Sequence, residues 1–154
     1  MRKLRLVLTV SILAAATAAP LAADDKTDVM VPVHQFVDGF NKGDVKSAVA
    51  ACADETSIID EFPPYAWHGA GACSKWASDF DADAKKNDIK PGAVTLGKPR
   101  HVDVTGDHAY VVVPTEYGYT MKGKPVKEMG STLAVTLQKG ASGWLITAWA
   151  WAKH

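Results

Sequence analysis

The chain has 154 residues, and its 17 basic and 17 acidic side chains give a formal net charge of zero at neutral pH. This length suits one domain that is large enough to bury a core of its own. Beyond residue 23 the basic residues are scattered, and their longest run is Lys85-Lys86. Because the sequence has no basic patch, stripe or tail, we expect no nucleic-acid partner.

The N-terminus has the layout of a cleaved signal peptide. Residues 1–5 carry three positive charges, an apolar run occupies 6–16, and small residues continue to Ala23. A membrane anchor needs about 20 apolar residues, so this run is too short to be one. We expect cleavage after Ala18 or, preferably, after Ala23. The protein would then be periplasmic or secreted.

Removal of a signal peptide at residues 1–23 leaves a single domain at 24–154 with 14 basic and 17 acidic residues, a net charge near −3. No cysteine lies near either cut to carry a lipid, so we expect no membrane attachment after cleavage. The two cysteines, Cys52 and Cys73, lie in a chain that we expect in an oxidising compartment. An even pair there predicts a disulfide, with two buried free thiols as the alternative.

The first half of the domain has helical periodicity. Apolar residues recur at spacings of three and four over 28–42, which predicts a helix with Asp28 as its N-cap and Gly43 at its end. Asp44 is expected to cap a second, shorter helix that ends near Cys52. A third helix is predicted at about 72–87, after a loop that contains two prolines and two glycines.

The second half of the domain alternates apolar and polar residues, which is typical of strands. A short strand is also expected at 56–61, because this segment is rich in β-branched residues. The later strands are predicted at 93–104, 108–121, 126–138 and 143–153. Helices that come first and strands that come last predict an α+β fold, with three helices on one face of a curved, mostly antiparallel sheet.

Four short motifs together resemble the nuclear transport factor 2-like superfamily, which includes ketosteroid isomerases and SnoaL-like polyketide cyclases. They are Phe40-Asn41-Lys42-Gly43-Asp44, Ala53-Asp54-Glu55-Thr56-Ser57-Ile58, His68-Gly69 and Gly143-Trp144-Leu145-Ile146. The resemblance covers essentially the whole domain. It implies a cone-shaped α+β fold in which a bent sheet wraps around the helices and leaves an apolar pocket at the open end.

The same resemblance makes Asp60 the candidate catalytic residue. Asp60 falls where ketosteroid isomerases place their general base, and a carboxylate at the mouth of an apolar cavity suits that role. The alternative is an acid at a strand end that faces solvent. The isomerases' two oxyanion donors are missing, because their positions fall on Phe36 and near Ser131-Thr132.

Further pocket candidates come from the aromatic and polar residues of the predicted helices and strands. The candidate ligand-binding residues are His34, Phe36, Trp67, Glu116, Tyr117, Ser131 and Trp149. In an unbroken alternation Trp149 and Trp151 share one face of their strand, and Trp144 lies on the other. Core packing or a dimer face is the alternative for most of the aromatic residues.

These observations predict an exported domain that binds a small apolar or aromatic molecule without strong catalysis. The alternative is an isomerase, lyase or cyclase that uses Asp60 as general base. No histidine lies at metal-ligand spacing and no glycine-rich phosphate loop is present, so we expect no metal and no cofactor. Apolar residues on the uncovered sheet face predict a homodimer.

Overall fold

The computed structural model describes residues 26–154, so the predicted signal peptide at 1–23 lies outside the described residues. The helices are α2 (Met30–Lys42), α3 (Val45–Ala50) and α4 (Ala72–Lys86). The strands are β1 (Cys52–Ile59), β2 (Ala66–Ala70), β3 (Ile89–Leu96), β4 (His101–Thr105), β5 (His108–Met121), β6 (Lys124–Gly140) and β7 (Gly143–Ala152).

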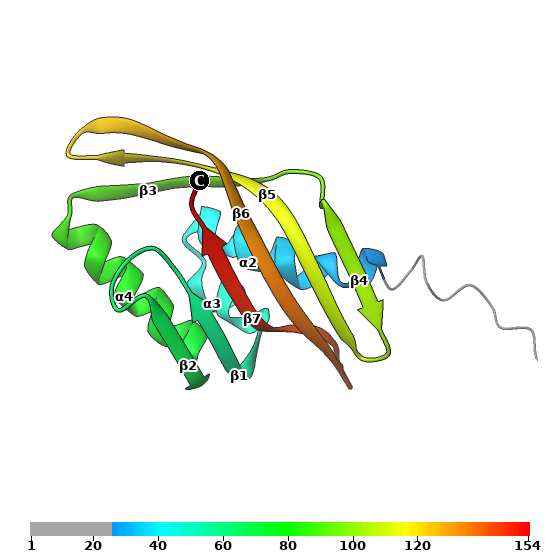
Figure 1. Ribbon diagram of the computed structural model, residues 1–154. Coiled ribbons are helices and arrows are strands. Elements are labelled where there is room, and N and C mark those ends of the chain that lie inside the picture. Colours follow the sequence, from blue (N-terminus) through cyan, green and yellow to red (C-terminus); the bar gives the residue numbers. More distant parts are fainter. Residues whose placement is uncertain (1–25) are drawn as a thin grey trace, which may run out of the picture.

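The seven described strands form one curved sheet in the order β2-β1-β7-β6-β5-β3, with β4 paired to β5 as well. Every pair is antiparallel except β1 with β7, which places Ser57 beside Ala148 from the other end of the domain. Helices α2 and α4 lie on the same side of this sheet (Figure 1). The predicted α+β architecture with a curved, mostly antiparallel sheet is confirmed.

The helices begin and end where local chemistry favours it. Gly43 ends α2 with a left-handed φ of 67°, which costs glycine little. The Asp44 carboxylate caps α3 by accepting a hydrogen bond from the Ser47 amide at 3.0 Å. The expected Asp28 cap is wrong, because Val29 is the N-cap of α2 and no side chain caps that end.

Three strand predictions need correction. Cys52 begins β1 instead of ending the second helix, and β2 occupies part of the predicted loop, so two strands precede the third helix. The predicted strand 93–104 is two strands, β3 and β4, because residues 97–100 between them are not in regular strand conformation. The Gly97 amide there donates to the Pro114 carbonyl at 2.8 Å.

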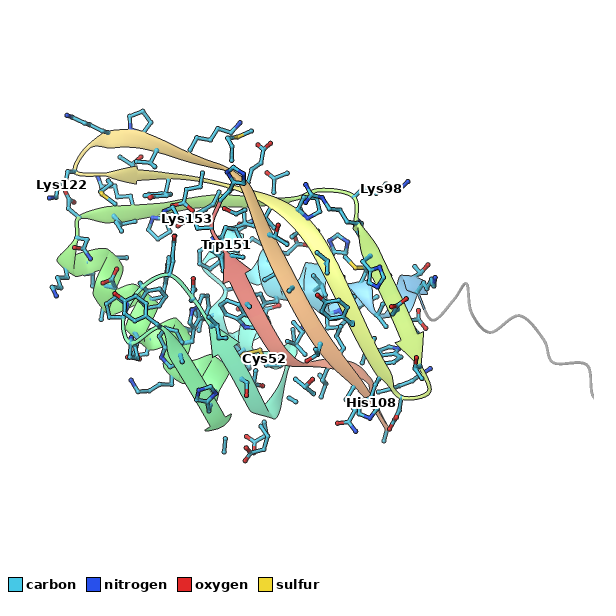
Figure 2. All side chains as sticks on the ribbon, in the orientation of Figure 1. Cys52, Lys98, His108, Lys122, Trp151 and Lys153 are labelled. Carbon is cyan, nitrogen blue, oxygen red and sulfur yellow. A yellow bond between two sulfur atoms is a disulfide. The ribbon has the colours of Figure 1, made fainter. Side chains whose placement is uncertain are left out.

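A disulfide joins β1 to the first turn of α4, as predicted. Cys52 and Cys73 are 21 residues apart in sequence, with their Cα atoms 6.5 Å apart. Figure 2 shows Cys52 at the base of the sheet, below the C-terminal end of the chain. Disulfides are typical of proteins in oxidising compartments. None of the helices in residues 26–154 has the length and apolar character needed to span a membrane.

Candidate functional site

A cavity of about 260 Å³ lies between the helices and the inner face of the sheet. Helices α2 and α4, the loop after β1, and strands β3, β5, β6 and β7 all contribute to its wall. Nine aromatic side chains line it: Phe36, Phe40, Phe62, Trp76, Phe80, Tyr117, Tyr119, Trp149 and Trp151. An enclosure of about 150 Å³ accepts benzene, so this one has room for a single ring with a substituent.

Asp60 lies in this wall, immediately after β1. The turn that follows is held by hydrogen bonds from the Asp60 amide to the Tyr65 carbonyl at 3.1 Å and from the Tyr65 amide to the Phe62 carbonyl at 2.9 Å. The carboxylate accepts hydrogen bonds from Trp76 Nε1 at 2.8 Å and from the Glu61 amide at 2.7 Å. These contacts fix the carboxyl group against the aromatic wall.

The surroundings of Asp60 change its acidity. Burial raises the pKa of its carboxyl group from 3.8 to about 6. The hydrogen bonds from Trp76 and from the Glu61 amide lower the pKa, but they do not offset the burial, and the nearby charges of Glu61 and Glu128 raise it further. A pKa of this size is within the range of a general base at neutral pH.

A buried carboxylate on β6 organises the mouth of the cavity. Glu128 is only 7% exposed, and its Oε1 atom accepts hydrogen bonds from the Tyr119 hydroxyl at 3.0 Å and from Lys153 Nζ at 2.7 Å. Lys153 also pairs with Glu61 Oε2 at 2.9 Å. Burial lowers the pKa of Lys153, but its two carboxylate partners outweigh this and raise it. Figure 2 shows Trp151 and Lys153 together at the end of β7.

Two side chains of the cavity wall carry hydrogen-bond donors that have no acceptor among the described residues. The Tyr117 hydroxyl approaches the Gly92 amide without the geometry of a hydrogen bond, and Trp149 Nε1 has no partner among the described residues. Burial raises the pKa of Tyr117, so its hydroxyl keeps its proton at neutral pH. Buried donors are normally paired, so these two are exceptions, and both atoms lie inside the wall and are not exposed at the cavity surface.

Four of the residues predicted from the sequence line this one cavity. Asp60 and Phe36 come from the loop after β1 and from α2, while Tyr117 and Trp149 come from β5 and β7. The rings of Phe36 and Trp149 are 5.4 Å apart between centroids, so residues from distant parts of the sequence meet directly.

Two other predicted residues point away from the cavity. His34 is exposed, because a separation of two residues places it about 200° around α2 from Phe36. Glu116 precedes Tyr117 on β5, and alternation turns its side chain to the opposite face, where it pairs with Lys127 at 3.1 Å. Neither of these two candidates lines the cavity.

Trp67 and Ser131 are buried but do not line the cavity. Trp67 Nε1 donates to Asp79 Oδ2 at 2.8 Å, and the Trp67 ring packs 5.0 Å from that of Phe62, behind the cavity wall. Ser131 is fully buried in the core opposite Thr115 on β5. Both residues therefore support the wall without reaching the cavity.

Several residues of the site could not be identified from the sequence pattern. Trp76 lies within the predicted third helix at 72–87, but nothing in the pattern indicated its hydrogen bond to Asp60. The contacts of Glu128 and Lys153 depend on strand register, which a bulge on β6 shifts between Ser131 and Glu128. Within residues 26–154 no group of three or more histidine, cysteine or acidic side chains is placed to hold a metal ion.

No family model matches the chain, and no curated protein matches it in sequence. Solved structures do resemble it. A ketosteroid isomerase-like protein from Erwinia carotovora superimposes with a TM-score of 0.67 at 18% identity, covering 85% of this chain and 97% of that one. A nuclear transport factor 2-like superfamily protein from Salmonella enterica gives a TM-score of 0.67 at 16% identity, covering 84% and 91%.

A third similar structure is a nuclear transport factor 2-like protein with a cystatin-like fold from Novosphingobium aromaticivorans. It gives a TM-score of 0.66 at 14% identity and covers 84% of this chain and 82% of that one. At sequence identities this low, the structural similarity shows a shared fold but does not show a shared activity. The chain therefore has the fold of the nuclear transport factor 2-like superfamily.

Proposed function

We propose that this domain is an exported binding module that holds a small apolar or aromatic molecule in the aromatic-lined cavity, without strong catalysis. The observation that carries the proposal is the cavity itself, about 260 Å³ in volume and lined by nine aromatic side chains. Small-molecule sites are typically concave and mostly apolar, with a few polar groups that orient the ligand. Asp60 supplies such a group here.

Two independent features support export. The N-terminal sequence has the charge and hydropathy layout of a cleaved signal peptide. The described domain contains the disulfide between Cys52 and Cys73, and such bonds persist mainly in oxidising compartments. A periplasmic or secreted location accounts for both.

Filling the cavity is expected to abolish ligand binding. Leu133 lines the cavity and is 3% exposed, so Leu133→Trp places a larger side chain in the space that a ligand would occupy. The matched control is Leu145→Trp, on β7 and outside the cavity wall. Calorimetric titration with toluene, indole and 2-naphthol should show binding to the wild type and to Leu145→Trp only. Equal binding by both variants would contradict the proposal.

A second function is favoured by a specific observation, the buried carboxyl group of Asp60 with its pKa of about 6. An isomerase, lyase or cyclase would use Asp60 to remove a proton from a carbon next to a carbonyl. Tyr117 and Trp149 belong to the same cavity wall, and their buried donors have no hydrogen-bond partner among the described residues; a shift of either side chain would bring its donor to the developing oxyanion. They would take the place of the donors that are missing at Phe36 and Ser131.

We also propose that the protein is a homodimer, joined through the outer face of the sheet. That face bears alanines on β6 and β7, with Ile59 and Tyr110 beside them at 58% and 43% exposure. Exposed apolar patches of this kind usually mark interfaces.

Light scattering at tens of micromolar should therefore give twice the monomer mass for the wild type. Ala150→Glu places a charge on this outer face and should give the monomer mass, whereas Ala141→Glu, in an exposed turn, should leave the dimer intact. A monomeric wild type would contradict the dimer proposal.

A further inference from the structure

The wall of the cavity carries more negative than positive charge. Among residues 26–154, the carboxylates that line it belong to Asp60, Glu61 and Asp83, and the ammonium belongs to Lys153. This ammonium is already held by Glu61 at 2.9 Å and by Glu128 at 2.7 Å, so it is not available to Asp60. An ion pair involving Asp60 is absent from the described residues, although this carboxyl group is largely buried.

A group of aromatic rings adjoins the Asp60 carboxyl group through Trp76. Trp76 donates its Nε1 hydrogen to Asp60, and the Trp76 ring stands edge-on to that of Trp149 with centroids 4.9 Å apart. The Phe36 ring completes the group, 5.6 Å from Trp76 and 5.4 Å from Trp149. The faces of such rings are electron-rich, so the rings and the carboxylate both favour positive charge.

We infer that the cavity binds an organic cation, in which an alkylated ammonium head group lies against the rings beside Asp60. The inference rests on the proposed binding function and names the ligand class for that site. A quaternary ammonium head group needs no hydrogen-bond acceptors and is attracted to aromatic faces. It also supplies the counter-charge that Asp60 lacks.

Other ligand charges suit the cavity less well. A neutral apolar molecule would leave the Asp60 carboxylate buried with two hydrogen bonds but no counter-charge, which is unfavourable. An anion would face the carboxylates of Asp60, Glu61 and Asp83 at close range. The volume admits about one ring and a compact head group, since benzene occupies an enclosure of about 150 Å³. Phenyltrimethylammonium has this size and charge.

The test compares three probes that differ mainly in charge: phenyltrimethylammonium, its neutral counterpart tert-butylbenzene, and benzoate. Calorimetric titration at pH 7.5 should show phenyltrimethylammonium binding to the wild type at least about tenfold more tightly than tert-butylbenzene, with no binding of benzoate. Asp60→Asn keeps the side-chain shape and should remove most of that preference. Asp81→Asn, on the exposed face of α4, should retain it.

The outcomes separate this inference from the proposed function. If tert-butylbenzene binds as tightly as phenyltrimethylammonium, the cation preference is wrong while the binding module stands. If none of the three probes binds, and toluene and indole fail as well, both proposals are wrong. If Asp60→Asn unfolds at a much lower temperature, the wild-type comparison of the charged and neutral probes decides alone, because it needs no variant.

Discussion

Replacing both cysteines by alanine is expected to lower the free energy of unfolding by about 3 kcal/mol. The disulfide joins Cys52 to Cys73 across a sequence separation of 21 residues. In the chain-entropy account, a cross-link over a loop of this length restricts the unfolded chain by roughly that amount. It also joins β1 to α4, which contribute the Asp60 loop and Trp76 to the cavity wall.

Urea denaturation of the oxidised wild type, the reduced wild type and the Cys52→Ala/Cys73→Ala variant measures this effect. The reduced wild type keeps both sulfur atoms, so it separates the loss of the cross-link from the loss of packing around Cys73, which is 3% exposed. The reduced wild type and the double alanine variant should show similar decreases in the free energy of unfolding relative to the oxidised wild type. A loss below about 0.5 kcal/mol in the reduced protein would show that the cross-link contributes little.

The second large effect is a change in pH dependence on Asp60→Asn. Because the folded pKa of Asp60 is about 6 and the ordinary value is 3.8, the native chain binds more protons than the unfolded chain between about pH 4 and pH 6. The wild type therefore loses stability as the pH rises through this window. The whole shift is equivalent to about 3 kcal/mol, of which about 0.6 is already lost at pH 4, so the loss between pH 4 and pH 8 relative to the variant should be about 2.4 kcal/mol.

The effect is measured as the difference in unfolding free energy between the wild type and Asp60→Asn, because other groups titrate as well. Glu61 and Glu128 face Asp60 from its own loop and from β6, and Lys153 and Asp83 share its cavity. These groups are present in both proteins. The side-chain amide of the variant also loses one of two accepted hydrogen bonds, which shifts its stability by about 1 kcal/mol without a pH dependence. Parallel curves of unfolding free energy from pH 4 to pH 8 would show that Asp60 is not desolvated.

The same two proteins test the enzymatic alternative. If Asp60 is a general base, the wild type should catalyse exchange of the α-hydrogens of cyclohexanone in deuterium oxide, and Asp60→Asn should not. Exchange is followed by proton NMR and compared with buffer alone. Binding without exchange would leave the binding module as the function of the cavity.

The sequence predicted the regular elements better than the irregular ones. The periodicity over 28–42 corresponds to α2, and the alternation over 108–121 corresponds to β5. Each of these elements runs without interruption and buries one face, so its sequence pattern is regular. Strand β2 was missed because two prolines precede it and glycines occur in it and just after it, a composition typical of loops. It forms because β1 needs a partner on its free edge, with Ile58 opposite Trp67.

For the site, Asp60, Tyr117 and Trp149, which the sequence singled out, line the cavity. Irregularities in the strands account for much of what was missed. A bulge at Thr147 on β7 inserts one residue, which turns Trp144 to the same buried side as Trp149, contrary to the expected alternation. The partners of Glu128 likewise follow a bulge on β6. A sequence pattern counts residues along one strand and contains no information on such insertions.

The parallel pairing of β1 with β7 has a consequence for biogenesis. Ser57 lies beside Ala148, so β1 stays an unpaired edge on that side until the end of the chain is available. A nascent chain that lacks β7 cannot close the sheet or complete the cavity, because Trp149 and Trp151 are part of β7. Contacts between such distant segments form late and slow folding. A chain with this topology therefore cannot complete its sheet before its C-terminal strand has been synthesised.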